Sequence, residues 1–320
     1  MSLKSIKGKL ILPGFWTSFQ QTVFWPDFKK IFLFVSLMMA IVHSISAQSN
    51  LSFSMGGGVM YYNGDLSDKS YLPPTEIVKP FGTADISFLL VDRLELSFRY
   101  LKGSVKGDDA LSDEKDNLYR NLSFHSKIDE VCGVFRVRLF GVRSQRAVNP
   151  YGMFGFGYFW FNPQAELNGK TYDLQPLGTE GQFIPGGEYA APYKLQSASM
   201  TLGIGLLLRL NDQFSLRVEA SPQLTYTDYL DDASTIYPDS TALAATPNGA
   251  IAVQMSSKRP RGYPVKGRSR GNPDRDDVMV TFGMSIVYTP PSRKKTYGAK
   301  PGIFNQMFKG RKGWWGLTPN

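Results

Sequence analysis

The sequence has very little cysteine and histidine: its 320 residues include one cysteine, Cys132, and two histidines, His43 and His125. A single cysteine cannot form an internal disulfide bond, and Cys132 has no second cysteine for metal or redox chemistry. No cysteine lies near the expected export signal, so the residue that anchors exported lipoproteins is also missing. If the protein is exported, its stability must come from sources other than disulfide bonds.

Long apolar runs are also scarce, with one exception near the start. Residues Ile31–Val42 read IFLFVSLMMAIV, follow two lysines and precede the segment HSISAQ. A basic flank, an apolar core and a small-residue cleavage site are the parts of a secretory signal peptide. We therefore expect residues 1–47 to be a signal peptide with a long leader, cleaved between Ser46 and Gln48. A membrane anchor is the alternative, but the run is shorter than the roughly 20 residues that cross hydrocarbon as a helix.

The sequence is rich in strict alternation of apolar and polar residues. Residues 201–220 read TLGIGLLLRLNDQFSLRVEA, in which every second residue is apolar on both sides of a turn. This alternation predicts a hairpin with one apolar face. The same pattern recurs and predicts eight strands, over residues 51–62, 81–90, 94–100, 129–140, 151–160, 201–210, 214–220 and 278–288.

Three features favour a membrane barrel over a β-sandwich, whose strands also have one wet face. Tilted strands need about 9–11 residues to span a bilayer, and six of the eight predicted strands have 10–12, whereas sandwich strands are nearer 5 or 6. Aromatic residues such as Tyr61, Tyr100, Trp160 and Tyr288 stand at strand ends, where interfacial girdles lie. Long and short connections alternate strictly along the chain.

These features predict an all-β fold, an eight-stranded antiparallel transmembrane outer-membrane β-barrel over residues 48–289. Its apolar face would meet the lipids of the bacterial outer membrane, and closure would satisfy the backbone groups. Its long loops would be extracellular, its short turns periplasmic, and both chain termini periplasmic.

The opposite face of the predicted strands carries charges of both signs. With eight strands the lumen is just wide enough for side chains to fill it, so an open diffusion pore is not expected. We expect a plug of ion pairs, with an ion or proton path as the alternative. The predicted lumen charges are Asp85, Glu95, Arg99, Glu130, Arg136, Arg138, Arg209, Arg217 and Glu219.

Residues 1–47 carry five basic residues and one acidic one, which leaves +5 of the net charge of +9 for the mature chain. The tail supplies this basicity, because residues 290–320 contain seven basic residues and no acidic one. This tail would be periplasmic and could dock onto an acidic partner or lipid headgroups; a disordered solubilising tail is the alternative. Nucleic acid is a poor partner for an exported chain. The candidate docking residues are Arg293, Lys294, Lys295, Lys309, Arg311, Lys312, Trp314 and Trp315.

A second basic cluster lies in the last long loop. On the outer surface it could neutralise lipopolysaccharide phosphates, whereas its glycine and proline content favours a solvated, mobile loop. The cluster comprises Arg259, Arg261, Lys266, Arg268 and Arg270.

Little in the sequence supports an enzyme, and no cofactor is expected. After loss of His43, His125 is the one histidine left to act as a base, flanked by Ser123 and Ser126. A barrel lipid hydrolase would need such a pair, but we expect His125 on the outer loop or rim. The glycines at 56–58 have no helix after them, so they indicate close backbone approach rather than a phosphate-binding loop.

The acidic cluster Asp228, Asp231 and Asp232 has enough oxygen for calcium but lacks the spacing of a calcium loop. We favour a structural role, in which these carboxylates accept hydrogen bonds from backbone amides and so order the loop.

Two loop segments resemble the PorG-like family of small outer-membrane barrels in the type IX secretion machinery. They are TYDLQPLGTEGQ, residues 171–182, and TDYLDDASTIYPD, residues 227–239; YYNGDL at 61–66 and RNLSF at 120–124 are similar but less specific. The motif positions carried over are Tyr172, Asp173, Gln175, Pro176, Gly178, Thr179, Glu180, Gly181, Asp228, Tyr229, Asp231 and Asp232.

The resemblance covers nearly all of residues 50–289. It implies an eight-stranded, non-enzymatic structural barrel that contacts the outer-membrane lipoprotein of a periplasmic ring and helps to hold that ring beneath the membrane. It implies no catalytic residue and no cofactor. The insertion around residues 241–265 and the basic tail depart from the family pattern and could mark a paralogue with another partner. A free-standing barrel that stabilises the envelope or binds ligands at the surface is the alternative function.

Overall fold

The computed structural model describes residues 51–67, 73–144, 146–186 and 188–291. The expected signal peptide and all but the first two residues of the basic tail lie outside this part of the chain. None of the helices in the described residues has the length and apolar character needed to span a bilayer.

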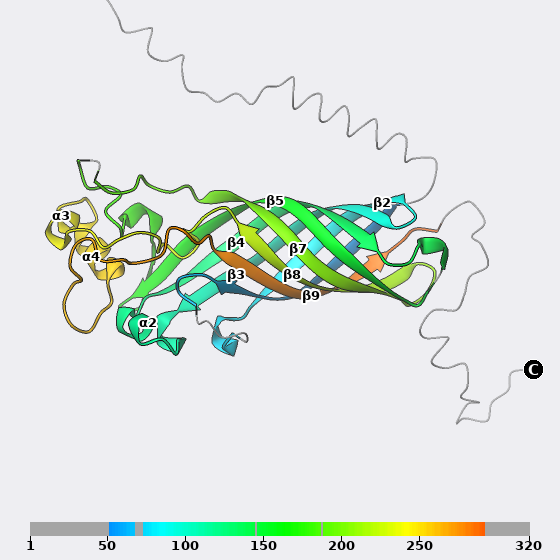
Figure 1. Cartoon of the computed structure of the whole chain (residues 1–320), viewed down its shortest axis with the longest axis horizontal. Coiled ribbons are helices and arrows are strands. Elements are labelled where there is room, and N and C mark those ends of the chain that lie inside the picture. The colour runs from blue at the N-terminus through cyan, green and yellow to red at the C-terminus, as the bar shows by residue number, and fades with distance from the viewer. Residues whose placement is uncertain (1–50, 68–72, 145, 187, 292–320) are drawn as a thin grey trace, which may run out of the picture. The chain divides into compact units, whose positions relative to one another are not determined.

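Eight strands close into an antiparallel outer-membrane-type β-barrel, which confirms the predicted fold (Figure 1). Each barrel strand pairs with the next along the chain, and β1 pairs with β9 to close the cylinder. Closure leaves no free sheet edge, as hydrocarbon surroundings require. The barrel strands are β1 (Leu51–Asn63), β2 (Lys79–Val91), β3 (Leu94–Asp108), β4 (Ser123–Arg138), β5 (Val148–Leu167), β7 (Gln196–Arg209), β8 (Phe214–Thr225) and β9 (Val278–Tyr288).

Connections at the two ends of the barrel differ in length, as predicted. The short-turn end carries the β2–β3, β4–β5 and β7–β8 turns, with η3 (Val142–Ser144) in the second. The other end carries the long connections 64–78, 109–122, 168–195 and 226–277, which we call the loop cap. The loop cap contains β6 (Lys170–Asp173), paired with the end of β5, and the helices η1 (Thr75–Ile77), η2 (Asp109–Leu111), α2 (Lys115–Arg120), η4 (Gln175–Leu177), α3 (Ser240–Ala244) and α4 (Gly249–Ser256).

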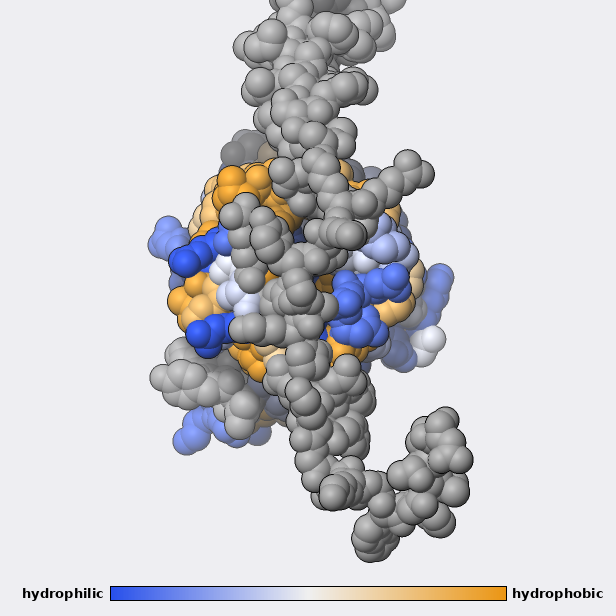
Figure 2. Space-filling model, turned by 90° about the vertical axis from the view of Figure 1, so that its right-hand side faces the viewer, coloured by the Kyte–Doolittle hydropathy of each residue, from blue (hydrophilic) through white to orange (hydrophobic). Residues whose placement is uncertain are grey.

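The outer wall is apolar over the half of the barrel next to the short turns. Met55 and Ile204 are 73% and 70% exposed, and many other large apolar side chains on this wall are also exposed. Figure 2 looks onto the short-turn end and shows the apolar flank around hydrophilic groups at the rim. A protein in water rarely exposes so large a contiguous apolar surface, so hydrocarbon is the solvent that suits this wall.

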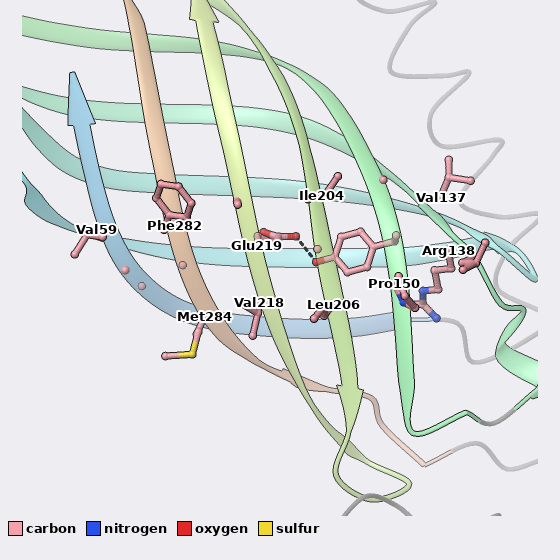
Figure 3. A pocket seen from close by; sticks show the side chains of 18 of the residues that line it. Val59, Val137, Arg138, Pro150, Ile204, Leu206, Val218, Glu219, Phe282 and Met284 are labelled. Carbon is pink, nitrogen blue, oxygen red and sulfur yellow. Dashed lines mark hydrogen bonds between the residues drawn. The ribbon is translucent and has the colours of Figure 1, made fainter. Parts of the chain in front are cut away.

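A hollow of about 1120 Å³ lies in this wall, lined by side chains from β1, β7, β8 and β9 (Figure 3). Val59, Ile204 and Met284 border it, and Gly57 and Gly152 leave room between them. Most of the lining is apolar, and its charged members are Arg93, Arg138 and Glu219. Lipid acyl chains suit the apolar, outward-facing part of the hollow.

The polarity of the two faces inverts part-way along the longest strands. On β3, Phe98 and Tyr100 face outward below the inversion, and Lys102 faces outward above it. The inward side changes in the opposite sense, from Arg99 to Leu101. β4 and β5 show the same inversion, with exposed Lys127 on β4 and exposed Trp160 followed by Asn162 and Gln164 on β5. Above this level the strands are therefore built like those of a protein in water, with an apolar interior.

An apolar core fills the barrel above the inversion and continues into the loop cap. The expected plug of ion pairs therefore does not extend into this half of the barrel. The helices α3 and α4 at the start of the last loop supply Leu243, Ala252 and Met255 to the core. Most of the basic segment that follows them is exposed, as expected for a solvated loop. The core residues from the strands are Met60, Tyr62, Leu101, Val105, Phe124, Ile128, Phe159, Phe161, Ala165 and Met279.

The glycines of β1 allow close approach to β9, as their position predicts. A Cβ atom on Gly58 would lie 2.0 Å from the carbonyl oxygen of Phe282, and one on Gly56 would lie 2.0 Å from that of Met284. A larger residue at either position would collide with backbone at the seam that closes the barrel.

Candidate functional site

Buried charges meet inside the short-turn half of the barrel. Arg217 Nη1 lies 3.0 Å from Asp85 Oδ2, and its Nη2 lies 2.6 Å from Glu95 Oε1. Arg99 joins Asp85 to Glu219, with Nε 2.8 Å from Asp85 Oδ1 and Nη2 2.5 Å from Glu219 Oε2. These side chains come from β2, β3 and β8, so the network ties opposite walls together.

Arg136 and Arg138 extend this network. Arg136 Nε lies 2.7 Å from Glu219 Oε1, and Arg138 pairs with Glu95 at the edge. Tyr151 also donates a hydrogen bond to Glu219, at 2.8 Å (Figure 3).

Two of the predicted lumen charges, Glu130 and Arg209, form no ion pair with this network in the described residues. Glu130 is buried nearer the loop cap, where Ser199 Oγ donates a hydrogen bond to it. Arg209 is the last residue of β7, at the short-turn end.

Little space remains around the charges. A cavity beside Arg99 and Glu219 has a volume of about 20 Å³. That is about enough for one water molecule. A filled interior is the arrangement expected for an eight-stranded barrel.

The two long motifs that carry the family resemblance pack directly against each other in the loop cap. Glu180 of the first motif accepts hydrogen bonds from the backbone N–H groups of Ser234 and Thr235 in the second, at 2.9–3.1 Å. Thr179 Oγ1 donates to Asp232 Oδ2 at 2.5 Å. Each motif thus supplies the polar partners that the other needs when it is buried.

Arg270 of the last loop holds this junction from the side. Its Nη1 lies 3.1 Å from Glu180 Oε1, and its Nη2 lies 3.2 Å from Asp232 Oδ2. Arg270 is 3% exposed, so the expectation of an outer-surface position for this residue is wrong. The reason is that two buried carboxylates require a buried cation.

The remaining residues of the first motif set the backbone conformation of this loop and hydrogen-bond it to its neighbours. Gly178 ends η4 with a φ of 61°, and Gly181 has a φ of 86°, both in the left-handed region that favours glycine. Pro176 lies in the first turn of η4. Asp173 accepts hydrogen bonds from two amide side chains of β5, and Gln175 donates to the carbonyl of Tyr193.

The second motif joins the cap to the barrel. Tyr62 at the end of β1 donates to Asp231 Oδ2 at 2.5 Å, and the backbone N–H of Ala233 donates to Asp231 Oδ1 at 2.8 Å. Tyr229 stacks on Tyr193, with ring centroids 4.4 Å apart. The carboxylate of Asp231 thus orders the loop in part through a backbone amide.

Burial shifts the acidity of this acidic cluster. It raises the pKa of Asp232 to about 6, of Asp231 to about 7 and of Asp228 to about 9. These carboxyl groups therefore take up protons far more readily than exposed ones. In the described part of the chain, no group of three or more His, Cys, Asp or Glu side chains is arranged to hold a metal ion.

His125 lies on β4 near the loop cap, opposite Lys106 on β3 and Gln164 on β5. Ser126, its neighbour, faces the interior and accepts a hydrogen bond from the backbone of Asn162. Within the described residues no hydrogen bond joins His125 to a serine, so this geometry provides no histidine-activated nucleophile.

Residues 29–252 match the model of a family described as "Domain of unknown function (DUF6089)". This chain belongs to the DUF6089 family. The match includes both long motifs and every barrel strand of the DUF6089 chain except β9.

Several solved outer-membrane barrels are similar to this DUF6089 protein at low identity. Neisserial surface protein A is 7% identical, over 76% of this chain and 99% of that one, with a TM-score of 0.37. A major outer membrane protein of Thermus thermophilus is 11% identical (74% and 98% covered, TM-score 0.35). OprG of Pseudomonas aeruginosa is 12% identical (75% and 96% covered, TM-score 0.34). No curated protein matches the chain.

The strand pairing establishes the fold without these similarities. Together with the apolar outer wall, it places this DUF6089 protein in a bacterial outer membrane.

Sequence reasoning missed the partners of the motifs, above all Arg270, Tyr62 and Tyr193. It also missed the β5–β6 hairpin that presents the first motif. The signal for that hairpin is Asn168–Gly169, two residues with positive φ of 53° and 76° between two strands. An Asn-Gly pair in this setting is a strong hairpin signal.

Proposed function

We propose that this DUF6089 barrel is a non-enzymatic structural component of the type IX secretion machinery that helps to anchor its periplasmic ring. The observation that supports it most is the direct contact between residues 171–182 and 227–239, the two segments that resemble the PorG-like family. Because Glu180 and Thr179 satisfy groups of the second segment, the two motifs form one structural unit. Two matching segments that pack into one unit support common ancestry with the PorG-like family more strongly than two unconnected short matches do.

In this proposal the ring contacts the short-turn end, which faces the periplasm. Arg93 and Arg146 are exposed there, and β9 ends there at Tyr288, just before the basic residues of 290–320 in the sequence. The partner would be an acidic face of the ring lipoprotein, which such a basic rim would attract.

Affinity purification from detergent-solubilised membranes tests this proposal. The tagged full chain should recover periplasmic ring components, and a chain without residues 290–320 should recover less of them. An Arg93→Glu, Arg146→Glu variant should also recover less, whereas Arg261→Glu in the loop cap should match the wild type. Failure to recover ring components, together with normal secretion in a deletion strain, would reject the proposal.

The second candidate function is a free-standing barrel that stabilises the envelope or binds ligands at the surface. A polar pocket in the loop cap, between residues 63–67, helix α2 and the last loop, favours this function, because a barrel that acts only at its periplasmic end does not need it. In that case deletion would weaken the envelope and leave secretion unchanged.

A further inference from the structure

A polar pocket of about 520 Å³ opens in the loop cap. It lies between residues 63–67, helix α2 and the last loop, and it includes five arginines. Two of them support the pocket floor: Arg120 pairs with Asp109 at 2.7 Å and donates to the carbonyl oxygen of Arg270 at 2.7 Å. The volume falls within the range of small-molecule sites.

The other three arginines line the pocket and form no ion pair with a carboxylate of the described residues. Arg259 Cζ lies 5.0 and 5.4 Å from the ring centroids of Tyr119 and Tyr237, and its Nε is buried with no hydrogen-bond partner among the described residues. The two rings stabilise the cation but accept no in-plane hydrogen bond from Nε. The guanidinium therefore keeps its charge without a carboxylate to neutralise it, and an anion in the pocket would be favourable here.

Arg268 and Arg275 complete the basic wall. The guanidinium of Arg268 is exposed and forms no ion pair with any residue in the described ranges. Arg275 donates to the neutral amide oxygen of Asn63 at 2.8 Å. Planar guanidinium groups suit the paired oxygens of phosphates and carboxylates.

A second set of lining side chains, which we call the acidic wall, has a different chemistry. Asp65, Glu114, Asp116 and Asn117 line it, and Asp65 already accepts a hydrogen bond from the backbone of Asn272. Carboxylates would repel a bare anion but accept hydrogen bonds from hydroxyl groups. A ligand that suits both walls has an anionic group at one end and several hydroxyl groups at the other.

We propose that this pocket binds an anionic sugar, with its phosphate or carboxylate on Arg259, Arg268 and Arg275 and its hydroxyl groups on the acidic wall. This site is independent of the proposed role in secretion, since it lies at the opposite end of the barrel from the ring contact.

Calorimetric titration of the full chain, purified in detergent, tests the site. The probes are glucose 1-phosphate, glucuronate, glucose and inorganic phosphate. Saturable binding is expected for one or both anionic sugars, and the pair distinguishes phosphate from carboxylate recognition. Glucose and inorganic phosphate should bind more weakly by roughly tenfold or more, because each satisfies one wall only.

Arg268→Gln is the decisive variant, because an exposed side chain can be changed without disturbing the fold. It should weaken binding of the anionic sugar by roughly tenfold, through loss of one charge-assisted contact. Arg259→Gln should weaken it similarly, and Lys266→Gln, whose lysine pairs with Glu188 outside the pocket, should bind as the wild type does. Absence of saturable binding, equal binding of inorganic phosphate, or unchanged affinity in Arg268→Gln would overturn the proposal.

Discussion

Arg217 shows how a charge is accommodated inside the barrel. Its side chain is 1% exposed and reaches Asp85, Glu95 and Ser54 from the far wall of the lumen. Removing one partner from a buried ion-pair network strongly destabilises the folded state, because the remaining charges are left buried and unpaired. Replacing the whole network with apolar side chains would change the stability much less. The interior charges thus depend on one another.

We expect Arg217→Gln to lower the free energy of unfolding by about 3–5 kcal/mol, because Asp85 and Glu95 would each lose a buried cation. Urea titration of the refolded barrel in detergent measures this change. Arg261→Gln, an exposed change in the loop cap, should shift the unfolding free energy by less than about 0.5 kcal/mol. Equal behaviour of the two variants would contradict the network's structural role.

The raised pKa values of the carboxyl groups in the loop cap predict a pH dependence of stability. Burial holds the pKa of Asp228 at about 9 against an ordinary value of 3.8, so the folded cap keeps a proton that the unfolded chain releases. The cap is therefore most stable at acid pH and loses stability as the pH rises towards about 9.

In Asp228→Asn this dependence should shrink, because the amide carries no titrating proton. Amide exchange of residues 229–235, corrected for the intrinsic rate, should be slower than in the wild type at pH 9 and similar at pH 5. Asp113→Asn, at an exposed site, is the control. Faster exchange in the wild type at pH 5 than at pH 9 would have the wrong sign for this account.

At the scale of single elements, the sequence predicts the barrel better than the cap. Alternation predicts all eight strands because the membrane imposes it on every one of them. The alternation ends β3 and β5 too early in the sequence prediction. The reason is that the outward face changes from apolar to polar between Tyr100 and Lys102 on β3 and between Trp160 and Asn162 on β5.

The cap could not be predicted in the same way. Its contacts join residues far apart in sequence, such as Glu180 to Ser234 and Arg120 to Arg270. No local periodicity encodes these pairs. The two long motifs indicated that their loops have a defined structure. The structure shows which residues hold them, among them Arg270, which pairs with Glu180.

The β1–β9 seam yields a prediction at this scale. Gly58→Ala should sharply reduce the fraction of barrel that folds, because the new Cβ atom would lie within 2.5 Å of β9 backbone atoms. Gly82→Ala is a matched control on the neighbouring strand, where the nearest atom would be 3.8 Å away. The heat-sensitive mobility of the folded barrel on gels measures both. Equal folded fractions in the two variants would show that the seam tolerates a side chain.

The whole molecule combines two kinds of interior in one cylinder. Ion pairs fill the part that the membrane surrounds, and an apolar core fills the part that extends into the cap. Both are closely packed, so no continuous aqueous path is expected through the described barrel.

We therefore predict no stable open-channel conductance when the purified protein is inserted into planar bilayers. A double variant, Arg217→Ala with Arg136→Ala, should also conduct poorly, because the apolar core above the charges remains. Steady conductance of the wild type at a level typical of porins would contradict the sealed interior.

Spin labels along β5 test the central claim most directly, namely that hydrocarbon surrounds the barrel up to the level at which its polarity inverts. In a Cys132→Ser background, single labels replace the outward-facing residues Phe156 and Gln164. The account predicts that oxygen relaxes the label at 156, while a water-soluble nickel chelate relaxes the label at 164. Access of the nickel chelate to position 156, or shielding of that label from both reagents, would contradict it.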